Sequence, residues 1–247
     1  MSSSCTLLQL CKDAADECGI GRPTAVIGSS GRAVQRLLTF CSREGRDLMR
    51  SVDWTILQRL HTFTTTDATA EYDLPSDYDR LIVSTEWDRS KYEPLIGPLS
   101  PQRWQAIKSG LIGSGLVGRR YRIYRSDSSA AKTFRLDPTP TTSNDDETLA
   151  FEYISKNWCA STGGTAAAAW VADTDYTLLD DDLNMLGTVI RFKRSIGLDF
   201  ASEADEHAAI MARTTGQDRP APVLSMAPSP RGRLIGPEQL PETGLGS

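Results

Sequence analysis

Residues 32–52 read RAVQRLLTFCSREGRDLMRSV. Apolar side chains recur in this stretch at steps of three and four residues, which is the spacing of one face of an α-helix. The pattern predicts a helix from about Arg32 to Val52, with Ser29 or Ser30 as its N-cap. The helix must bury that face against other elements, so it places a helical core at this point of the chain. The face consists of Val34, Leu37, Leu38, Cys41, Leu48, Met49 and Val52.

The opposite side of this helix is charged. We interpret it as a surface that faces solvent or a neighbouring subunit, because charged side chains are rarely buried without partners. It carries Arg36, Arg43, Glu44, Arg46 and Asp47.

Helical spacing also occurs toward both ends of the chain. Thr6 to Cys18 predicts a short first helix that ends at Gly19. After Tyr176 a longer pattern begins with Asp180-Asp181-Asp182, and Ala201 to Arg213 either continues that helix or forms a second one. Three carboxylates at a helix start complement the positive end of its dipole. We favour this reading of the triplet over a metal site, since adjacent helical residues point in different directions.

The residue types in the middle of the chain are those that favour β-strands. β-Branched and aromatic residues predict a β-rich unit of short strands separated by turn formers, with one short helix at Pro101 to Ser109 capped by Ser100. Cys159 to Ala169 is rich in small residues and predicts a loop that crosses a surface or reaches a neighbour. The expected strands are Thr62–Thr66, Ala70–Leu74, Leu81–Trp87, Arg120–Arg125, Thr133–Leu136 and Thr148–Ile154.

The last 29 residues, Arg219 to Ser247, contain six of the 13 prolines. Proline lacks a backbone donor and has a restricted φ, so this segment cannot form a helix or a central strand. We predict either an extended arm that binds a groove or sheet edge of a partner, or a solvated tail. The candidate partner-binding residues are Pro220, Pro222, Val223, Leu224, Met226, Leu234 and Ile235.

Together these patterns predict an α+β fold. Helices from the two ends of the chain form a helical bundle (residues 1–54 and 177–218). A β-rich unit with a sandwich-like or barrel-like form (residues 55–176) is inserted between them. An extended proline-rich C-terminal arm (residues 219–247) follows.

Composition narrows the classes of function. A net charge of −5 and a pI near 5.2 argue against a protein that coats nucleic acid. Five cysteines without a C-x-x-C pair favour reduced thiols over a disulfide scaffold or a zinc site. The sequence shows neither an export signal nor an apolar run long enough to span a membrane, so we expect no membrane association.

Two short motifs match known functional signatures. Gly113-Ser114-Gly115-Leu116-Val117-Gly118 matches the dinucleotide-binding pattern, but a predicted helix precedes it and a predicted strand follows it, which is the wrong order for that site. Leu240-Pro241-Glu242-Thr243-Gly244 spells a sortase signal without the apolar and basic segments that such a signal needs. We interpret the first as a loop and the second as a chance match, and we expect no cofactor.

The chain contains two histidines, His61 and His207. Neither has nucleophile or metal-ligand spacing around it, so we expect no enzyme. The strand arginines Arg120, Arg122 and Arg125 could touch nucleic acid, although pairing at a subunit contact or facing solvent is the reading we prefer.

Several segments resemble the head-to-tail adaptor proteins of short-tailed bacteriophages, the family that includes tail tubular protein A. The resemblance rests on Trp170-x-x-Asp173-x-Asp175 leading through Leu183 to Arg191-Phe192-Lys193-Arg194 and Gly197-Leu198-Asp199-Phe200. It rests also on Tyr72-Asp73-Leu74-Pro75-Ser76-Asp77-Tyr78, and on Asp137-Pro138-Thr139-Pro140 followed by Phe151-Glu152-Tyr153. The similar region covers about residues 5 to 213.

This resemblance implies a structural protein of the virion neck, assembled in the host cytoplasm. It implies a homo-oligomeric ring, usually of twelve copies, that lies between the portal protein and a tail nozzle or tail tube protein. Double-stranded DNA would pass through the central channel. Candidate subunit-contact residues are Arg36, Arg43, Arg46, Arg191, Lys193 and Arg194.

Two alternatives remain open at this point. The β-rich unit could bind a carbohydrate or the host surface through aromatic residues such as Trp87, Tyr92 and Trp104. A cell-wall hydrolase is the other alternative, although no pair of carboxylates is singled out by an apolar setting.

Overall fold

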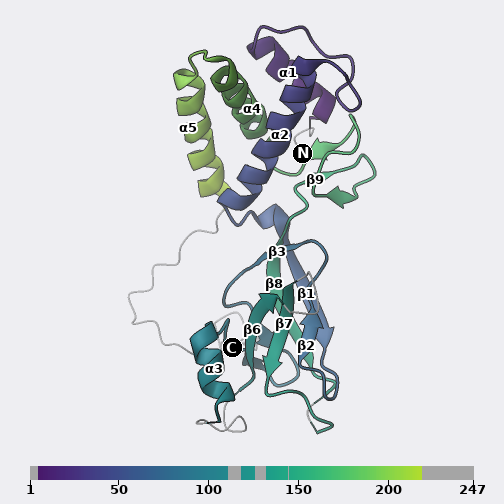
Figure 1. Ribbon diagram of the computed structural model, residues 1–247, viewed down its shortest axis with the longest axis vertical. Helices are drawn as coiled ribbons and strands as arrows, with labels where there is room; N and C mark the ends of the chain where they lie inside the picture. Colours follow the sequence, from purple (N-terminus) through teal and green to yellow (C-terminus); the bar gives the residue numbers. More distant parts are fainter. Residues whose placement is uncertain (1–4, 111–117, 126–131, 144, 219–247) are drawn as a thin grey trace, which may run out of the picture.

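The computed structural model of the chain describes residues 5–110, 118–125, 132–143 and 145–218. Figure 1 shows helices α1, α2, α4 and α5 at one end of an elongated molecule, with the larger β-sheets and helix α3 at the other end. The fold is α+β, as predicted, and its sheets are antiparallel. None of the helices described in these ranges combines the length and the apolar character needed to span a membrane.

Helix α1 spans Leu7–Glu17 and helix α2 spans Arg32–Ser51, which confirms both predictions. Thr6 caps α1 by accepting a hydrogen bond from the Gln9 backbone N–H. The predicted serine cap of α2 is wrong, because Gly31 occupies the cap position. The Ser29 hydroxyl instead accepts from the Gly31 N–H over 3.3 Å and closes the turn before the helix.

Helix α4 spans Asp181–Ile196 and helix α5 spans Ala201–Asp218, so the C-terminal pattern forms two helices. Asp180 caps α4 through a 3.0 Å hydrogen bond from the Leu183 N–H, which confirms the dipole reading of the aspartate triplet. Gly197 ends α4 in the left-handed conformation, with φ of +79°. Helix α5 contains no fully buried residue, so it lies on the outside of the helical part.

The helical part has its own apolar core. Leu7, Leu37, Leu183 and Val189 from α1, α2 and α4 are fully or almost fully buried in one cluster. Trp158 joins the same cluster from the segment after the sheet, together with Trp170. The segment 158–170 thus packs with the helices, although the predicted boundary placed it in the β-rich unit; that boundary itself stays a prediction.

The β-rich part consists mainly of two antiparallel sheets. In the first, β8 (Thr148–Ser155) pairs with β1 (Gln58–Thr64) on one side and with β3 (Tyr78–Leu81) and β4 (Trp87–Asp88) on the other. Strand β5 (Glu93–Pro94) pairs with β4. In the second sheet, β7 (Lys132–Asp137) lies between β2 (Glu71–Asp73) and β6 (Arg120–Arg125). The 3₁₀ helix η1 (Thr55–Leu57) connects α2 to β1.

Stacked aromatic rings join the two sheets. Phe151 of β8 and Phe134 of β7 are parallel with centroids 5.3 Å apart, and Tyr121 of β6 stacks on Phe134 at 4.7 Å. Phe63 of β1 lies 4.8 Å from Tyr72 of β2. The two sheets therefore face each other across an aromatic core, in a two-layer arrangement.

Two of the predicted β-segments differ from the structure. Leu81–Trp87 is not one strand, because Ser84 has a φ of +73° and a turn separates β3 from β4. The predicted loop Cys159–Ala169 contains paired strands, β9 (Cys159–Ala160) and β10 (Ala166–Ala167), and β11 (Tyr176–Thr177) pairs on the other side of β9. Burial of Cys159 and Ala160 against the helical core stabilises this small sheet where the residue types alone predict a loop.

The remaining predictions in the middle of the chain are confirmed with small shifts of their ends. β6 has the predicted bounds, β7 and β8 are each longer, β2 is shorter at both ends, and β1 starts at Gln58 instead of Thr62. Helix α3 (Pro101–Lys108) begins at the predicted cap, where the Ser100 hydroxyl accepts from the Arg103 N–H.

Candidate interaction surfaces

The aspartates of the segment 170–175 hold the N-terminal part of the chain in place. The Asp173 carboxylate accepts hydrogen bonds from the backbone N–H groups of Val26 and Ile27, at 2.7 to 3.2 Å. The Asp175 carboxylate is buried and accepts from Val171 and Ala172, while its backbone carbonyl accepts from the Leu7 N–H over 2.7 Å. Both side chains thus have a structural role between distant segments.

Glu44 is the largest departure from the predicted surface of α2. It was assigned to the charged outer side, but it is only 5% exposed, because α4 and α5 pack over it. Arg191 of α4 donates from Nε to Glu44 Oε2 and from Nη2 to Asp47, both at 2.7 Å. His207 of α5 places Nε2 3.3 Å from Glu44 Oε1. This ionic cluster connects three helices.

Gly187 makes room for the buried carboxylate of Glu44. A Cβ atom at position 187 would lie well inside 3.0 Å of the Glu44 carboxyl carbon. Burial alone would raise the pKa of Glu44, but hydrogen bonds and charge from His207 and Arg191 outweigh it and hold the pKa below its ordinary value. The carboxylate is therefore charged at neutral pH and binds α4 and α5 to α2.

The six predicted subunit-contact residues fall into different surroundings. Arg43, Arg191 and Arg194 line one shallow hollow between α2 and α4, together with Phe40 and Ser195. Arg43 and Arg194 are exposed there, whereas Arg191 is half-buried by its ion pairs. The hollow presents guanidinium groups beside the Phe40 side chain, which suits an acidic side chain of a partner.

The other three residues do not line this hollow. Lys193 points to the opposite side of α4 and donates to Glu203 of α5 over 2.5 Å. This intramolecular pair raises the pKa of Lys193 and fastens the start of α5 to α4. Arg36 is half-buried and Arg46 is exposed, both on α2. Their assignment to a subunit contact stays a prediction.

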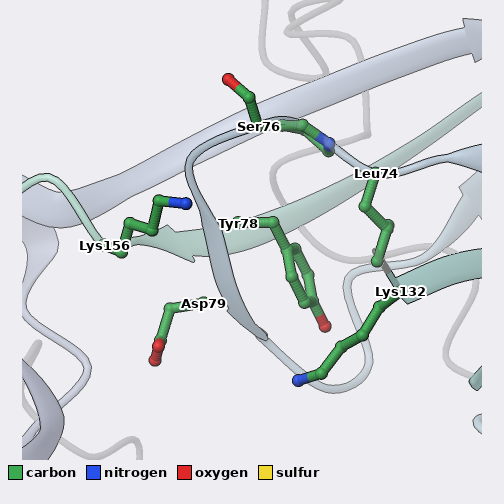
Figure 2. Close-up of a pocket in the computed structure, with 7 residues that line it drawn as sticks. Leu74, Ser76, Tyr78, Asp79, Lys132 and Lys156 are labelled. Atoms are coloured by element: carbon green, nitrogen blue, oxygen red, sulfur yellow. The ribbon is translucent and has the colours of Figure 1, made fainter. Parts of the chain in front are cut away.

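Figure 2 shows a polar recess in the β-rich part, with Tyr78 and Lys132 beside each other and Lys156 reaching in from the end of β8. Lys132 Nζ lies 5.7 Å from the centroid of the Tyr78 ring. Burial raises the pKa of Tyr78 to about 12, so its hydroxyl stays protonated at neutral pH. Leu74, Pro75, Ser76 and Asp79 complete the lining. The recess can hold a polar group of a partner.

Asp77, next to Tyr78, fixes the conformation of segment 72–78, one of the segments on which the resemblance to phage adaptors rests. Its carboxylate accepts hydrogen bonds from the hydroxyls of Tyr153 and Ser155 on β8, at 2.9 and 2.7 Å. The segment therefore turns back onto the sheet, and its polar residues serve packing.

Both readings of the strand arginines, the preferred one at a subunit contact or facing solvent and the alternative of contact with nucleic acid, are wrong for Arg120. This residue is buried, and it pairs with Asp137, which also binds Lys108 of α3. Arg122 lies over the Tyr124 ring at 5.4 Å, and Arg125 is exposed. Arg120 alternates with Tyr121, whose ring lies in the aromatic core, so it points to the other face of the sheet, where Asp137 and Lys108 of α3 meet.

The histidines and the surface aromatics also have definite places. His61 lies among aromatic rings, 5.2 Å from the Phe151 centroid, and His207 lies against Glu44. Trp104 is buried under Arg135 of β7, Trp87 is half-buried, and Tyr92 is 80% exposed. The three aromatics proposed for sugar stacking thus differ widely in exposure, and Trp104 cannot present its ring. Within the described ranges, no group of three or more metal-ligating side chains comes together.

The predicted arm and both short motifs lie wholly or largely outside the described residues. This applies to the seven partner-binding candidates Pro220, Pro222, Val223, Leu224, Met226, Leu234 and Ile235, to the 240–244 motif, and to all but the last glycine of the 113–118 motif.

Comparison with known proteins shows the family of the chain. A search of the curated proteins found no match. The model of the SU10 adaptor protein family matches residues 6–221, which spans both the helical and the β-rich parts. The match supports a bacteriophage adaptor protein; it does not single out the tail tubular protein A-like group within such adaptors. On this evidence, the chain belongs to the SU10 adaptor protein family.

Proposed function

We propose that the protein forms a ring between the portal and the tail of a phage virion, with a central channel for the passage of double-stranded DNA. The observation that carries this proposal is the family match over residues 6–221. The earlier resemblance suggests about twelve copies, a portal on one side and a tail nozzle or tail tube protein on the other. The place of action is then the virion neck, after assembly in the host cytoplasm.

The contacts within the chain support different roles for the helical and the β-rich parts of the subunit. Glu44 and Arg191 form an ion pair between α2 and α4, and the aspartates of segment 170–175 accept hydrogen bonds from backbone N–H groups of the same chain. These contacts make the subunit a rigid body. A ring subunit needs such a body, because each copy must present two different faces to its neighbours. We assign residues 1–54 and 177–218 to the subunit-contact and portal side, and the β-rich residues 55–176 to the tail side.

The hollow lined by Arg43 and Arg194 is our candidate for a subunit contact. Guanidinium groups that are exposed in one copy can pair with carboxylates of the next, and charge reversal would then replace attraction with repulsion. We expect Arg43→Glu with Arg194→Glu to prevent ring formation while leaving the fold intact. Arg89→Glu, an exposed arginine of the β-rich part, is the matched control.

The arm is our candidate for portal binding, and its replacement tests the proposed function. Residues 219–247 would be exchanged for a glycine-serine linker of equal length, which retains chain length but removes the proline and apolar residues. We expect a folded protein that attaches poorly to portal-bearing, DNA-filled capsids, measured by co-sedimentation and by electron microscopy of the neck. Normal attachment of this variant would exclude the arm from the mechanism. Failure of the native protein to attach would refute the proposed function.

A further inference from the structure

Strand β1 leaves one side of its backbone open. Thr65 N donates to Glu147 O over 2.9 Å, so the odd-numbered residues of this antiparallel ladder bond to β8. On the opposite side of β8, the Ile82 N–H donates to the Glu152 carbonyl, so the even-numbered residues of β8 bond away from β1. The N–H and C=O groups of Leu60, Thr62 and Thr64 therefore point away from the sheet. In the part of the chain that the structure describes, no strand pairs with β1 on that side.

This open edge is long and accessible. β1 has seven residues and contains no proline, and Leu60, Thr62 and Thr64 are exposed, with Leu60 at 55%. Unpaired edges of this kind accept a strand from another chain unless they are covered or interrupted. His61 and Phe63 of the inner face are only half-buried, because the aromatic core ends at this edge. An added strand would gain both backbone hydrogen bonds and apolar contact.

The arm starts at the junction between the two parts, where α5 ends beside η1. Asp218, the last described residue, accepts hydrogen bonds from the Thr55 N–H and hydroxyl at 2.9 and 2.6 Å, which fastens the end of α5 beside η1. In Figure 1 this end of α5 lies on the left of the junction between the two parts, whereas β1 forms the right-hand side of the β-rich part. A donor on one side and an acceptor on the other suit contacts that run head to tail from copy to copy.

The positions of prolines and apolar residues in the arm indicate which of its segments could add to β1 as a strand. Three proline-free windows of five or more residues are available, residues 223–227, residues 231–236 and residues 242–247, and the last contains one large apolar residue, Leu245. In the first, Leu224 and Met226 are two residues apart and would share one face of a strand, with Val223 and Ser225 on the other. In the second, Leu234 and Ile235 would point to opposite faces. The first window alone places two apolar side chains together, as the half-buried His61 and Phe63 require.

We infer that residues 223–227 of one copy add as an edge strand to β1 of the neighbouring copy, with Leu224 and Met226 against His61 and Phe63. This inference rests on the proposed function, because it specifies how the copies of the ring are joined. Five residues after Asp218 can reach at most about 17 Å, so the neighbour's β1 lies close to this copy's α5. Residues 228–247 continue beyond the contact and stay available to the portal.

Disulfide trapping between two full-length variants tests the contact. One preparation carries Thr62→Cys and the other Ser225→Cys, and they are mixed and oxidised. Leu224 and Met226 against His61 and Phe63 put Ser225 opposite Thr62 on the outer face, and paired strands bring the two Cα atoms within the distance that a disulfide spans. We expect a cross-linked pair whose 62–225 disulfide is identified by peptide mass. Val171→Cys replaces Thr62→Cys in the control, because Val171 is 73% exposed but lies away from β1. A yield no higher than that of the control would overturn the inference.

A second measurement separates backbone pairing from simple proximity. A fluorescently labelled peptide of residues 219–230 is titrated into full-length protein. Thr62→Pro removes an N–H that points away from β8 and so breaks no bond of the existing ladder. We expect several-fold weaker binding to Thr62→Pro and unchanged binding to Thr62→Val, which retains the N–H. Equal binding to all three proteins would contradict strand addition.

Capsid attachment distinguishes the two proposals from each other. If Thr62→Pro and wild type both assemble necks of normal appearance and no 62–225 cross-link forms, the inference is wrong and the adaptor proposal stands. If the 62–225 cross-link forms but the native protein never joins portal-bearing capsids, the contact is upheld and the adaptor proposal is wrong.

Discussion

The indole ring of Trp158 lies directly against the backbone of Gly45 in α2. A Cβ atom at position 45 would lie well inside 3.0 Å of three atoms of the Trp158 ring. Trp158 is fully buried, packs edge-on against Trp170 at 4.8 Å, and donates from its indole N–H to the Ala168 carbonyl. Through this contact the end of β8 is locked into the helical core, so the two parts of the molecule share one hydrophobic core at their junction.

Gly45→Ala is expected to destabilise the protein. The added methyl group would force the Trp158 ring or the helix to move, and such overpacking costs about 1–3 kcal/mol. Gly216→Ala in α5 is the control, because a Cβ there meets nothing within 4 Å. That change should stabilise the helix slightly. Chemical denaturation followed by tryptophan fluorescence measures both, and equal free energies of unfolding for Gly45→Ala and wild type would contradict the packing described.

Glu44→Gln is expected to lower the free energy of unfolding at pH 7 by about 2 kcal/mol, because Arg191 loses a charged acceptor but retains Asp47. The folded-state pKa of Glu44 lies below its ordinary value of 4.5. Its stabilisation is therefore complete above that pH and is lost as the pH falls through the folded-state pKa.

The difference in stability between wild type and Glu44→Gln should then shrink as the pH falls below about 4.5. Urea denaturation at a series of pH values measures this difference. Glu206→Gln, an exposed position on α5, is the matched control and should match wild type throughout. A difference that stays constant down to acidic pH would show that the Glu44 charge contributes nothing.

Asp173→Asn is expected to loosen the segment around Val26 and Ile27. The substitution replaces a carboxylate that accepts two backbone N–H groups with a weaker acceptor, at a cost of about 1–3 kcal/mol. Hydrogen exchange should accelerate at these two amides more than elsewhere. Asp205→Asn, exposed on α5, should leave exchange unchanged. Unaltered protection of Val26 and Ile27 would rule out this role for Asp173.

The five cysteines are free thiols, and three of them, Cys11, Cys41 and Cys159, are buried. Burial raises the pKa of Cys18 to about 11 and that of Cys159 to about 12, so the reactive thiolate is scarce at pH 8. A thiol-reactive dye at pH 8 should label Cys159 only after unfolding and Cys18 slowly. Mass spectrometry of labelled peptides measures each site, and protein in denaturant supplies the complete reaction. Rapid labelling of Cys159 in the native protein would contradict its burial.

Local pattern was sufficient for most of the secondary structure. Caps at Thr6, Ser100 and Asp180, together with regular apolar spacing, act within a few residues of each helix end, so they can be recognised without a partner. The strand Arg120–Arg125 was equally clear. By contrast, β9 and β10 form only because Cys159 and Ala160 are covered by the helical core, which the small side chains of that stretch do not reveal.

The candidate surfaces were harder to predict than the fold. Arg191 and Lys193 lie in a basic run that predicts an exposed cluster, yet both pair within the chain, with Glu44 and Glu203. Glu44 itself could have been suspected from Gly45 and Gly187, because a glycine inside a helix often marks a close contact. No local signal identified which helix supplies that contact.

The sequence by itself determined where the helices and most strands form and which family the chain resembles. Those properties depend on side-chain periodicity and caps, which act over a few residues. Only the tertiary structure decided which charges are buried, which arginines remain exposed, and that no strand of the described residues pairs with the outer side of β1. Burial and strand pairing depend on segments more than a hundred residues apart, such as Glu44 with Arg191, and residue types in one segment do not specify their partner in another.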